Sequence, residues 1–122
     1  MKILVVDDDD SLRKAQERLF KAHGHEVITA PDPVMAMVEL GNCGGVDLVI
    51  TDLNMPAPNS RSYNEGLQLI TDIRKTFPEQ KIILVSGDMT DQIAVQATAL
   101  GAEVGLPKTA LFGYLRETGV MN

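Results

Sequence analysis

The feature that most constrains this chain is a regular alternation of short apolar runs with segments of helical spacing. The runs are rich in Val, Ile and Leu, which is typical of strands that are buried on both faces of a sheet. Because each run is followed by a helical segment, the sequence predicts an α/β fold of five strand–helix units around a parallel sheet. The expected strands are Lys2–Val6, Glu26–Ala30, Asp47–Asp52, Lys81–Ser86 and Glu103–Leu106.

Helix boundaries are predicted from apolar spacing and from capping residues. Gly24 and Gly41 are expected to end the first two helices, Pro33 to begin the second, Pro78 to end the third, and Thr90 to cap the fourth. A short last helix is expected near Thr109 to Thr118, and the whole is expected to be a doubly wound, flavodoxin-like (βα)5 sheet with strand order 2-1-3-4-5. The apolar stripes are expected at Leu12, Ala15, Leu19 and Ala22, then Val34, Met37 and Val38, then Leu67, Ile70, Ile73 and Phe77, and last Ile93, Ala97 and Leu100.

Length and composition narrow the class of protein. The 122 residues suit a single domain, 1–122, and no apolar run approaches the ~20 residues of a membrane helix. A net charge of −6 argues against direct nucleic-acid binding, which needs basic side chains. Cys43 is the only cysteine, and His23 and His25 are expected to be surface residues, so no cysteine or paired-histidine metal site is expected. We expect a cytoplasmic protein that does not bind membranes.

Polar and charged residues stand at the carboxyl ends of four expected strands. Asp7 and Asp8 follow the first strand, Asp52 ends the third, Ser86 ends the fourth, and Lys108 follows the fifth. In a parallel sheet these ends meet at one edge, where open α/β sheets place their binding sites. The sequence therefore predicts one site built from residues that are spread over most of the chain.

The expected site carries more negative than positive charge. Two carboxylates about 4 Å apart repel by roughly 4 kcal/mol at an effective dielectric of 20, and one lysine cannot offset three of them. Oxygen ligands with room for water suit Mg²⁺. A carboxylate beside such a metal, a lysine and a hydroxyl favours phosphoryl transfer to Asp52, with Lys108 and Ser86 contacting the phosphoryl oxygens.

These residues lie in motifs that resemble those of a known family, the receiver domains of two-component response regulators, including the chemotaxis receivers. Val5–Asp9 resembles the acidic motif of that family, and Asp52–Pro56 resembles its phosphoacceptor motif. Val85–Gly87 resembles the motif of the switch hydroxyl, and Leu106–Lys108 the motif of the lysine. All four agree in order and spacing over essentially the whole chain.

The resemblance implies a phosphoacceptor, and not an enzyme beyond its own phosphorylation and dephosphorylation. Asp52 would take a phosphoryl group from the phosphohistidine of a sensor kinase or phosphotransfer protein and pass the signal to a downstream protein; a homodimer is compatible with the family. Mg²⁺, replaceable by Mn²⁺, would be held by Asp8, Asp52 and the backbone carbonyl of Asn54, with Asp7 acting through water. Lys108 and Ser86 would contact the phosphoryl group.

Three positions depart from the family pattern. Gly105 stands where receivers usually have a switch aromatic, so we expect a weakened or rerouted response around the fourth helix and fifth strand. Thr109 replaces the usual proline, and we expect either a cis peptide after Lys108, which is favoured, or a displaced lysine. The connection Ala57–Glu65 is about six residues longer than usual; it is either a tolerated loop or brings Arg61 or Tyr63 to the site or to a partner.

Other classes fit the residues less well. A haloacid-dehalogenase-like phosphatase needs a second aspartate where Asn54 stands, and an EF-hand needs alternating ligands and a glutamate where Arg18 stands. A flavodoxin-like cofactor site needs a glycine-rich loop after the first strand, where this chain has four aspartates. A degenerate receiver, which would act as a phosphorylation-independent interaction module, is the remaining alternative.

Overall fold

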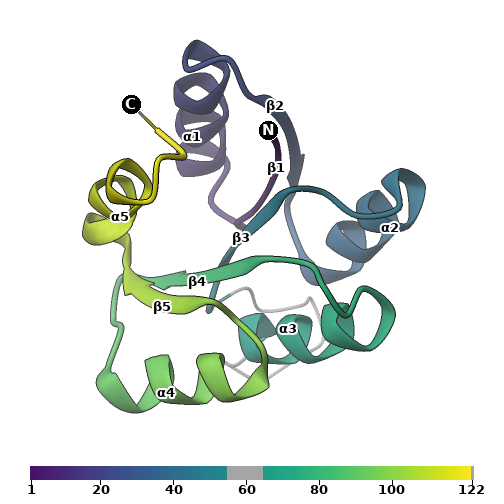
Figure 1. Cartoon of the computed structure of the whole chain (residues 1–122), viewed down its shortest axis with the longest axis vertical. Helices are drawn as coiled ribbons and strands as arrows, with labels where there is room; N and C mark the ends of the chain where they lie inside the picture. Colours follow the sequence, from purple (N-terminus) through teal and green to yellow (C-terminus); the bar gives the residue numbers. More distant parts are fainter. Residues whose placement is uncertain (55–64, 122) are drawn as a thin grey trace.

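A computed structural model describes residues 1–54 and 65–121 of the chain. Its parallel sheet has the order β2-β1-β3-β4-β5, which confirms the predicted flavodoxin-like topology (Figure 1). Val6 of β1 is in register with Ala30 and Thr51 of the neighbouring strands, so the carboxyl ends lie at one edge. The strands are β1 (Lys2–Val6), β2 (Glu26–Ala30), β3 (Leu48–Asp52), β4 (Ile82–Ser86) and β5 (Val104–Pro107).

Helices cover both faces of the sheet. Helices α1 and α5 lie on one face, and α2, α3 and α4 lie on the other (Figure 1). This division follows from the right-handed crossover that joins each pair of parallel strands. The helices are α1 (Asp10–Ala22), α2 (Pro33–Cys43), α3 (Glu65–Thr76), α4 (Asp91–Leu100) and α5 (Leu111–Glu117), and a 3-10 turn, η1 (Lys108–Ala110), precedes α5.

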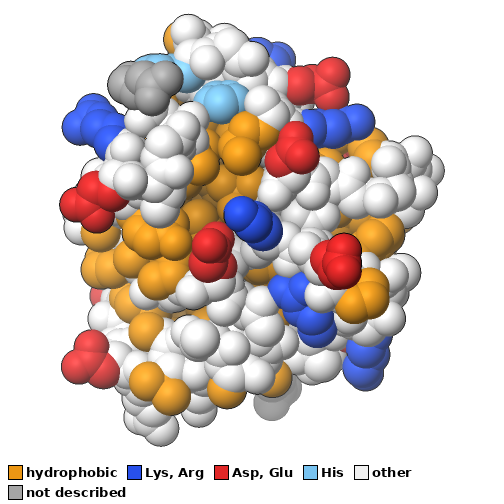
Figure 2. Space-filling view, in the orientation of Figure 1, with side chains coloured by type: hydrophobic (Ala, Val, Ile, Leu, Met, Phe, Trp, Pro, Cys, Tyr) orange, Lys and Arg blue, Asp and Glu red, His pale blue; other side chains and the backbone are white. Residues whose placement is uncertain are grey.

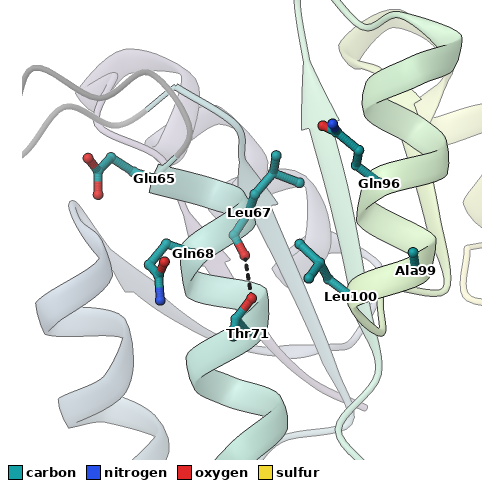
Figure 3. A pocket seen from close by; sticks show the side chains of 7 residues that line it. All are labelled: Glu65, Leu67, Gln68, Thr71, Gln96, Ala99 and Leu100. Atoms are coloured by element: carbon teal, nitrogen blue, oxygen red, sulfur yellow. Dashed lines mark hydrogen bonds between the residues drawn. The ribbon is translucent and has the colours of Figure 1, made fainter.

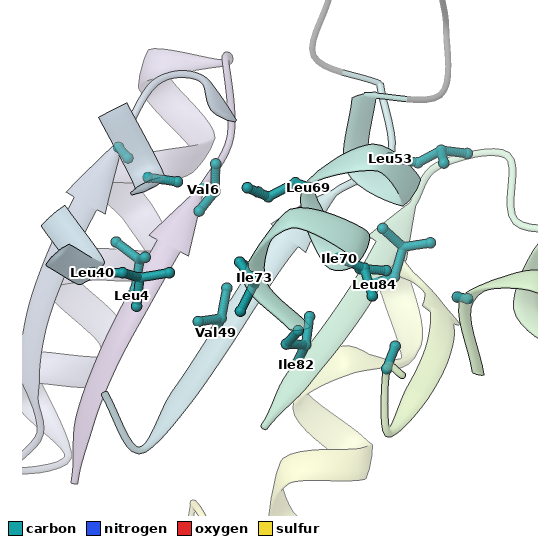
Figure 4. Packing of buried hydrophobic residues seen from close by; sticks show 14 residues of the cluster. Leu4, Val6, Leu40, Val49, Leu53, Leu69, Ile70, Ile73, Ile82 and Leu84 are labelled. Atoms are coloured by element: carbon teal, nitrogen blue, oxygen red, sulfur yellow. The ribbon is translucent and has the colours of Figure 1, made fainter. Parts of the chain in front are cut away.

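Alternate residues of the central strands supply two apolar cores. Leu4 and Val6 of β1 face α2 and α3, as Figure 4 shows. Ile3 and Val5 of the same strand face α1 and α5, where they pack with Phe20. All four strand residues are at most 1% exposed. The strand ends are therefore anchored from both faces, which fixes the positions of the side chains that follow them.

The predicted apolar stripe of α1 is wrong. Leu19 is 37% exposed and Ala15 is also exposed, whereas Phe20 is buried and Gln16 is only 5% exposed. The helix is rotated by about one residue from the predicted face, because the large ring of Phe20 fills the space beside β1 and α5. Gly24 follows the helix with a φ of 85°, as a residue after a helix end commonly does.

The predicted end of α2 at Gly41 is also wrong. The helix continues to Cys43 and ends at Gly44, which has a φ of 73°. Its buried residues are Ala36 and Leu40, and the predicted core residue Val34 is 70% exposed. Pro33 at the helix start and the cap by Thr90 on α4 agree with prediction.

The two histidines differ in their surroundings. His23 is exposed, as predicted. His25 is partly buried, donates a hydrogen bond from Nε2 to the Val120 carbonyl at 2.8 Å, and packs edge-on against Phe20. His25 therefore ties the β2 side of the molecule to the end of the described chain. On the face shown in Figure 2, the histidines lie side by side and acidic and basic side chains are scattered.

Candidate functional site

Three carboxylates meet at the carboxyl edge of the sheet. Asp7 follows β1, Asp8 follows Asp7, and Asp52 is the last residue of β3; their nearest oxygens all lie within 4.8 Å of one another. Asp7 and Asp52 are 2% and 5% exposed, whereas Asp8 is open to solvent. The cluster therefore combines two buried carboxylates, Asp7 and Asp52, with one that solvent can reach, Asp8.

Lys108 reaches this cluster from the end of β5. Its Nζ lies 3.3 Å from Oδ2 of Asp52 and 3.4 Å from Oδ2 of Asp7. The peptide between Lys108 and Thr109 is trans, since the described residues include no cis bond. The expectation of a cis bond or a displaced lysine is therefore wrong. The chain enters the 3-10 turn η1 at Lys108 and reaches the carboxylates without the roughly 3–4 kcal/mol cost of a cis bond before a non-proline residue.

Burial and neighbouring charges act in opposite directions on the pKa of Lys108, and opposing charges act on the pKa of Asp52. Burial raises the pKa of the Asp52 carboxyl, and the Asp7 charge raises it further, while Lys108 and the Asn54 backbone N–H offset only part of the rise. Burial by itself would lower the pKa of Lys108, but the charges of Asp52 and Asp7 outweigh burial and raise it. The lysine is thus held as a cation, and a further positive charge at the site would relieve the carboxylates.

Asn54 lies near the cluster in the chain, and Ser86 lies near it across the sheet. Ser86 ends β4 with no exposed surface, and its Oγ accepts a hydrogen bond from the Asp88 N–H at 3.1 Å. Asn54 follows Asp52 by two residues and is partly buried. Since β4 is next to β3 in the sheet, Ser86 lies one strand away from Asp52 at the same edge.

The donor set fits a hard divalent cation. Asp7, Asp8 and Asp52 offer three carboxylate oxygens, which is the chemistry that Mg²⁺ and Mn²⁺ accept, and Asp8 is open to water. One lysine leaves the group with a net negative charge. A metal site at this edge is therefore consistent with both the ligand type and the local charge.

The sequence did not reveal two residues that hold the site in place. Arg13 of α1 donates from Nη1 to the carbonyl of Asp7 at 2.7 Å and pairs with Asp10. Gly66 of α3 lies so close to β3 that a Cβ there would come within 2.7 Å of the Leu53 Cα. An arginine six residues after Asp7 was the available signal for the first. A glycine in the first turn of a helix, where it is otherwise unfavourable, was the signal for the second.

Neighbouring atoms fill the space beside Gly105, the position at which the resembled family usually has an aromatic residue. A Cβ at Gly105 would lie 3.0 Å from the Ala94 Cα and 3.4 Å from the Met89 Cε. Helix α4 therefore packs directly on the β5 backbone, and no space for a ring remains. Met89 lies in the connection between β4 and α4, three residues after Ser86, and takes part in this packing.

Two further regions are the long connection Ala57–Glu65 and a groove between α3 and α4. The long connection, including Arg61 and Tyr63, lies outside the described residues except for Glu65. A groove of about 670 Å³ between α3 and α4 is lined by Leu67, Thr71, Gln96 and Leu100, among others (Figure 3). Thr71 in this groove donates to the Leu67 carbonyl at 3.2 Å. The residues that line this groove do not include the clustered aspartates or Lys108.

Comparison with known proteins gives consistent results. Residues 3–118 match the family model of the response regulator receiver domain. The chain is 38% identical over 106 residues to the DNA-binding transcriptional regulator NtrC of Azospirillum brasilense, covering 87% of this chain and 21% of that protein. It is 34% identical to the sensor kinase CckA of Brucella abortus (strain 2308), covering 93% of this chain and 10% of that protein.

The structural match covers most of both chains. The solved receiver domain of NtrX from Brucella abortus is 32% identical, with a TM-score of 0.75, and the match covers 87% of this chain and 84% of that one. The curated relatives named above are much longer, since this chain spans only 10% and 21% of them. Within the described part of the chain, every helix is too short or too polar to span a bilayer.

Proposed function

This chain belongs to the response regulator receiver domain family, and from that premise we propose that Asp52 accepts a phosphoryl group from a phosphohistidine. The donor is a sensor histidine kinase or a phosphotransfer protein, which places the domain in the cytoplasm. The observation that carries this proposal is the position of the Lys108 ammonium, within 3.4 Å of both Asp7 and Asp52. It puts a cation beside the nucleophile that is to receive the phosphoryl group.

The transfer exchanges one bond to phosphorus for another. A carboxylate oxygen of Asp52 attacks the phosphorus atom and forms a P–O bond, while the P–N bond breaks and its electron pair returns to the imidazole. The Lys108 ammonium moves its contact from the Asp52 carboxylate to a phosphoryl oxygen, and the Ser86 hydroxyl donates to another. Burial of Asp52 limits competing hydration of the carboxylate.

Magnesium fits this proposal through the chain's own oxygen ligands. Asp8, Asp52 and the backbone carbonyl of Asn54 would hold it, with Asp7 contributing through a water. When bound, the ion supplies positive charge that offsets the carboxylates and the incoming phosphoryl oxygens. Asp7 and Lys108 keep their positions through Arg13 and η1, respectively. Mn²⁺ accepts the same oxygen ligands and is expected to substitute.

Because the protein's own carboxylate is modified, the domain acts as a phosphoacceptor and not as an enzyme on a separate substrate. Hydrolysis of the acyl phosphate by water returns Asp52 to its carboxylate. The switch changes binding of a downstream protein. We expect its output to be weakened or rerouted, since Gly105 carries no ring that could move and α4 lies directly against it.

Labelling by a small phosphodonor tests the phosphorylation proposal. Native protein is incubated with radiolabelled acetyl phosphate, with and without Mg²⁺, beside Asp52→Asn and the control Asp91→Asn. Asp91 is an exposed carboxylate in the first turn of α4, so its removal is expected to leave labelling intact. We expect labelling of the native protein and the control only when Mg²⁺ is present. Absence of labelling in all three proteins would favour the phosphorylation-independent interaction module.

A further inference from the structure

Helix α2 is apolar on its solvent side as well as on its buried side. Ala36 and Leu40 face the core, whereas Val34 is 70% exposed, Met35 39% and Val38 46%. These three are close in the helix, since Val34 and Val38 are one turn apart and Met35 adjoins Val34. Exposed apolar residues that occur singly are ordinary, but a contiguous group on one helix indicates an interaction surface.

A groove of about 360 Å³ adjoins this group, between α2 and α3. Val34 and Met35 line it from α2, and Leu69, which is buried, lines it from α3. The two helices contact each other on the same face of the sheet (Figure 1). The groove therefore continues the exposed apolar group of α2 inward to the core. We refer to the groove together with Val34, Met35 and Val38 as the α2 surface.

The rim of the α2 surface is acidic. Asp32 lines the groove on the α2 side and accepts a hydrogen bond from the Met35 N–H at 2.8 Å. Asp72 lines it on the α3 side and accepts from Gln68 Nε2 at 3.1 Å. The two carboxylates therefore lie on opposite sides of the groove, Asp32 on the α2 side and Asp72 on the α3 side. Among the described residues that line the groove there is no Lys or Arg, and α2 itself contains neither.

We propose that the α2 surface binds a helical segment of a partner protein that carries apolar side chains on one face and Lys or Arg beside them. The apolar face would cover Val34, Met35 and Val38, and the basic side chains would pair with Asp32 and Asp72. This is the arrangement by which amphipathic helices bind apolar grooves, with complementary charge at the rim.

The acidic rim disfavours other occupants. A second copy bound by the same surface would bring two acidic rims together, because a two-fold contact joins like to like. Anionic lipid and nucleic acid would be repelled by the same carboxylates. The site also differs from the phosphoacceptor edge, as it uses neither Asp52 nor Lys108. Its failure would leave the phosphorylation proposal unaffected.

A synthetic peptide tests this inference. The probe is an amphipathic helix made of Leu and Lys, and the control peptide has the same composition in an order without helical period. Binding is measured by titration of ¹⁵N-labelled protein, which locates the contact, and by calorimetry. We expect shifts that are centred on α2 and the first half of α3 for the amphipathic peptide only.

Val34→Glu and Val95→Glu form a matched pair of variants. Val95 lies on α4 and is 68% exposed, so the two changes add the same charge at equal exposure. A glutamate in the first turn of α2 is compatible with the helix dipole, and folding is expected to persist. We expect Val34→Glu to weaken peptide binding about tenfold and Val95→Glu to change it by less than about twofold.

The charge is tested by Asp32→Asn with Asp72→Asn, which keep the hydrogen-bonding oxygens. This double variant is expected to weaken binding about fivefold at low salt and less at high salt. The inference is overturned if Val34→Glu and Val95→Glu affect binding equally, if the control peptide binds as tightly, or if the shifts centre on Asp7 to Asp10. Any of these results would show general attraction of a cationic peptide to an acidic protein.

Discussion

The carboxyl edge of the sheet and the contact of α4 with β5 present opposite relations to the receiver family. At the edge, Asp7, Asp8, Asp52 and Lys108 come together as the family resemblance implies. At the α4–β5 contact, the ring is replaced by Gly105 and the space is closed by Ala94 and Met89. In the proposed function, phosphoryl transfer depends on charges at strand ends, whereas the response depends on packing between elements. The packing between α4 and β5 can therefore change while the charged residues at the carboxyl edge are retained.

The largest expected effect is at the carboxyl edge. Lys108→Ala should reduce the rate of labelling by acetyl phosphate by about 10²-fold or more, because a preorganised cation beside the nucleophile is lost. The matched control is Lys81→Ala, an exposed lysine at the opposite ends of the strands, which should label at the native rate. Rates are followed by radiolabel incorporation. Equal rates for the two variants would show that Lys108 is not part of the transfer site.

Gly66→Ala tests the support of the edge from α3. A methyl group there would lie 2.7 Å from the Leu53 Cα and 2.9 Å from a Leu84 methyl, so α3 must shift. We expect unfolding free energy to fall by about 1–3 kcal/mol. Gly113→Ala in α5 is the control, because nothing lies within 4 Å of its added methyl and stability should rise by up to ~1 kcal/mol. Urea denaturation measures both, and a stabilised Gly66→Ala would contradict the packing.

Gly105→Ala sharpens the contrast between the two regions. The added methyl would meet the Ala94 Cα at 3.0 Å, which is closer than ordinary contact, and the unfolding free energy should fall by about 1 kcal/mol. Labelling of Asp52 should stay within about twofold of native, since the methyl does not reach the carboxylates. Urea denaturation and radiolabelling check the two parts. A large loss of labelling would show that the two regions are coupled.

The smallest expected effect is the pH dependence of stability. The pKa of Asp52 is raised above its ordinary 3.8, so the folded state binds this proton more tightly than the unfolded state. The stability this provides is complete below pH 3.8 and is lost as pH rises through the raised pKa. In metal-free buffer, Asp52→Asn should therefore be more stable than native at pH 7, and the difference should vanish near pH 3. Urea denaturation at both pH values tests this, and a destabilised variant at pH 7 would contradict the sign.

The sequence allowed the topology and the clustered carboxylates to be predicted, because both follow from patterns along the chain. Apolar runs fixed the strands to within one residue, and parallel strands place Asp7, Asp52 and Lys108 at one edge. The predictions of the buried face of α1 and of the end of α2 were wrong. Both depend on how side chains fill space between elements: Phe20 takes the position that Leu19 was expected to hold.

Two further details could not be predicted from the sequence: the peptide conformation after Lys108 and the packing at Gly105. The trans peptide after Lys108 leads into the 3-10 turn η1. The contact at Gly105 reflects how near α4 approaches β5. The spacing of residues along the chain predicts neither the trans peptide nor this contact. A glycine in place of an aromatic ring indicated a changed output path, but only the packing of Ala94 and Met89 showed that the space had closed.

The most direct test compares amide chemical shifts of ¹⁵N-labelled protein in Mg²⁺ with and without beryllium fluoride as a phosphoryl mimic. We predict large changes at the amides of Asp7, Asp52, Ser86 and Lys108, and clearly smaller ones at Ala94 and Gly105. That result would mean that the edge binds the phosphoryl group while the α4–β5 contact stays closed. Changes at Ala94 and Gly105 as large as those at Asp52 would contradict the account.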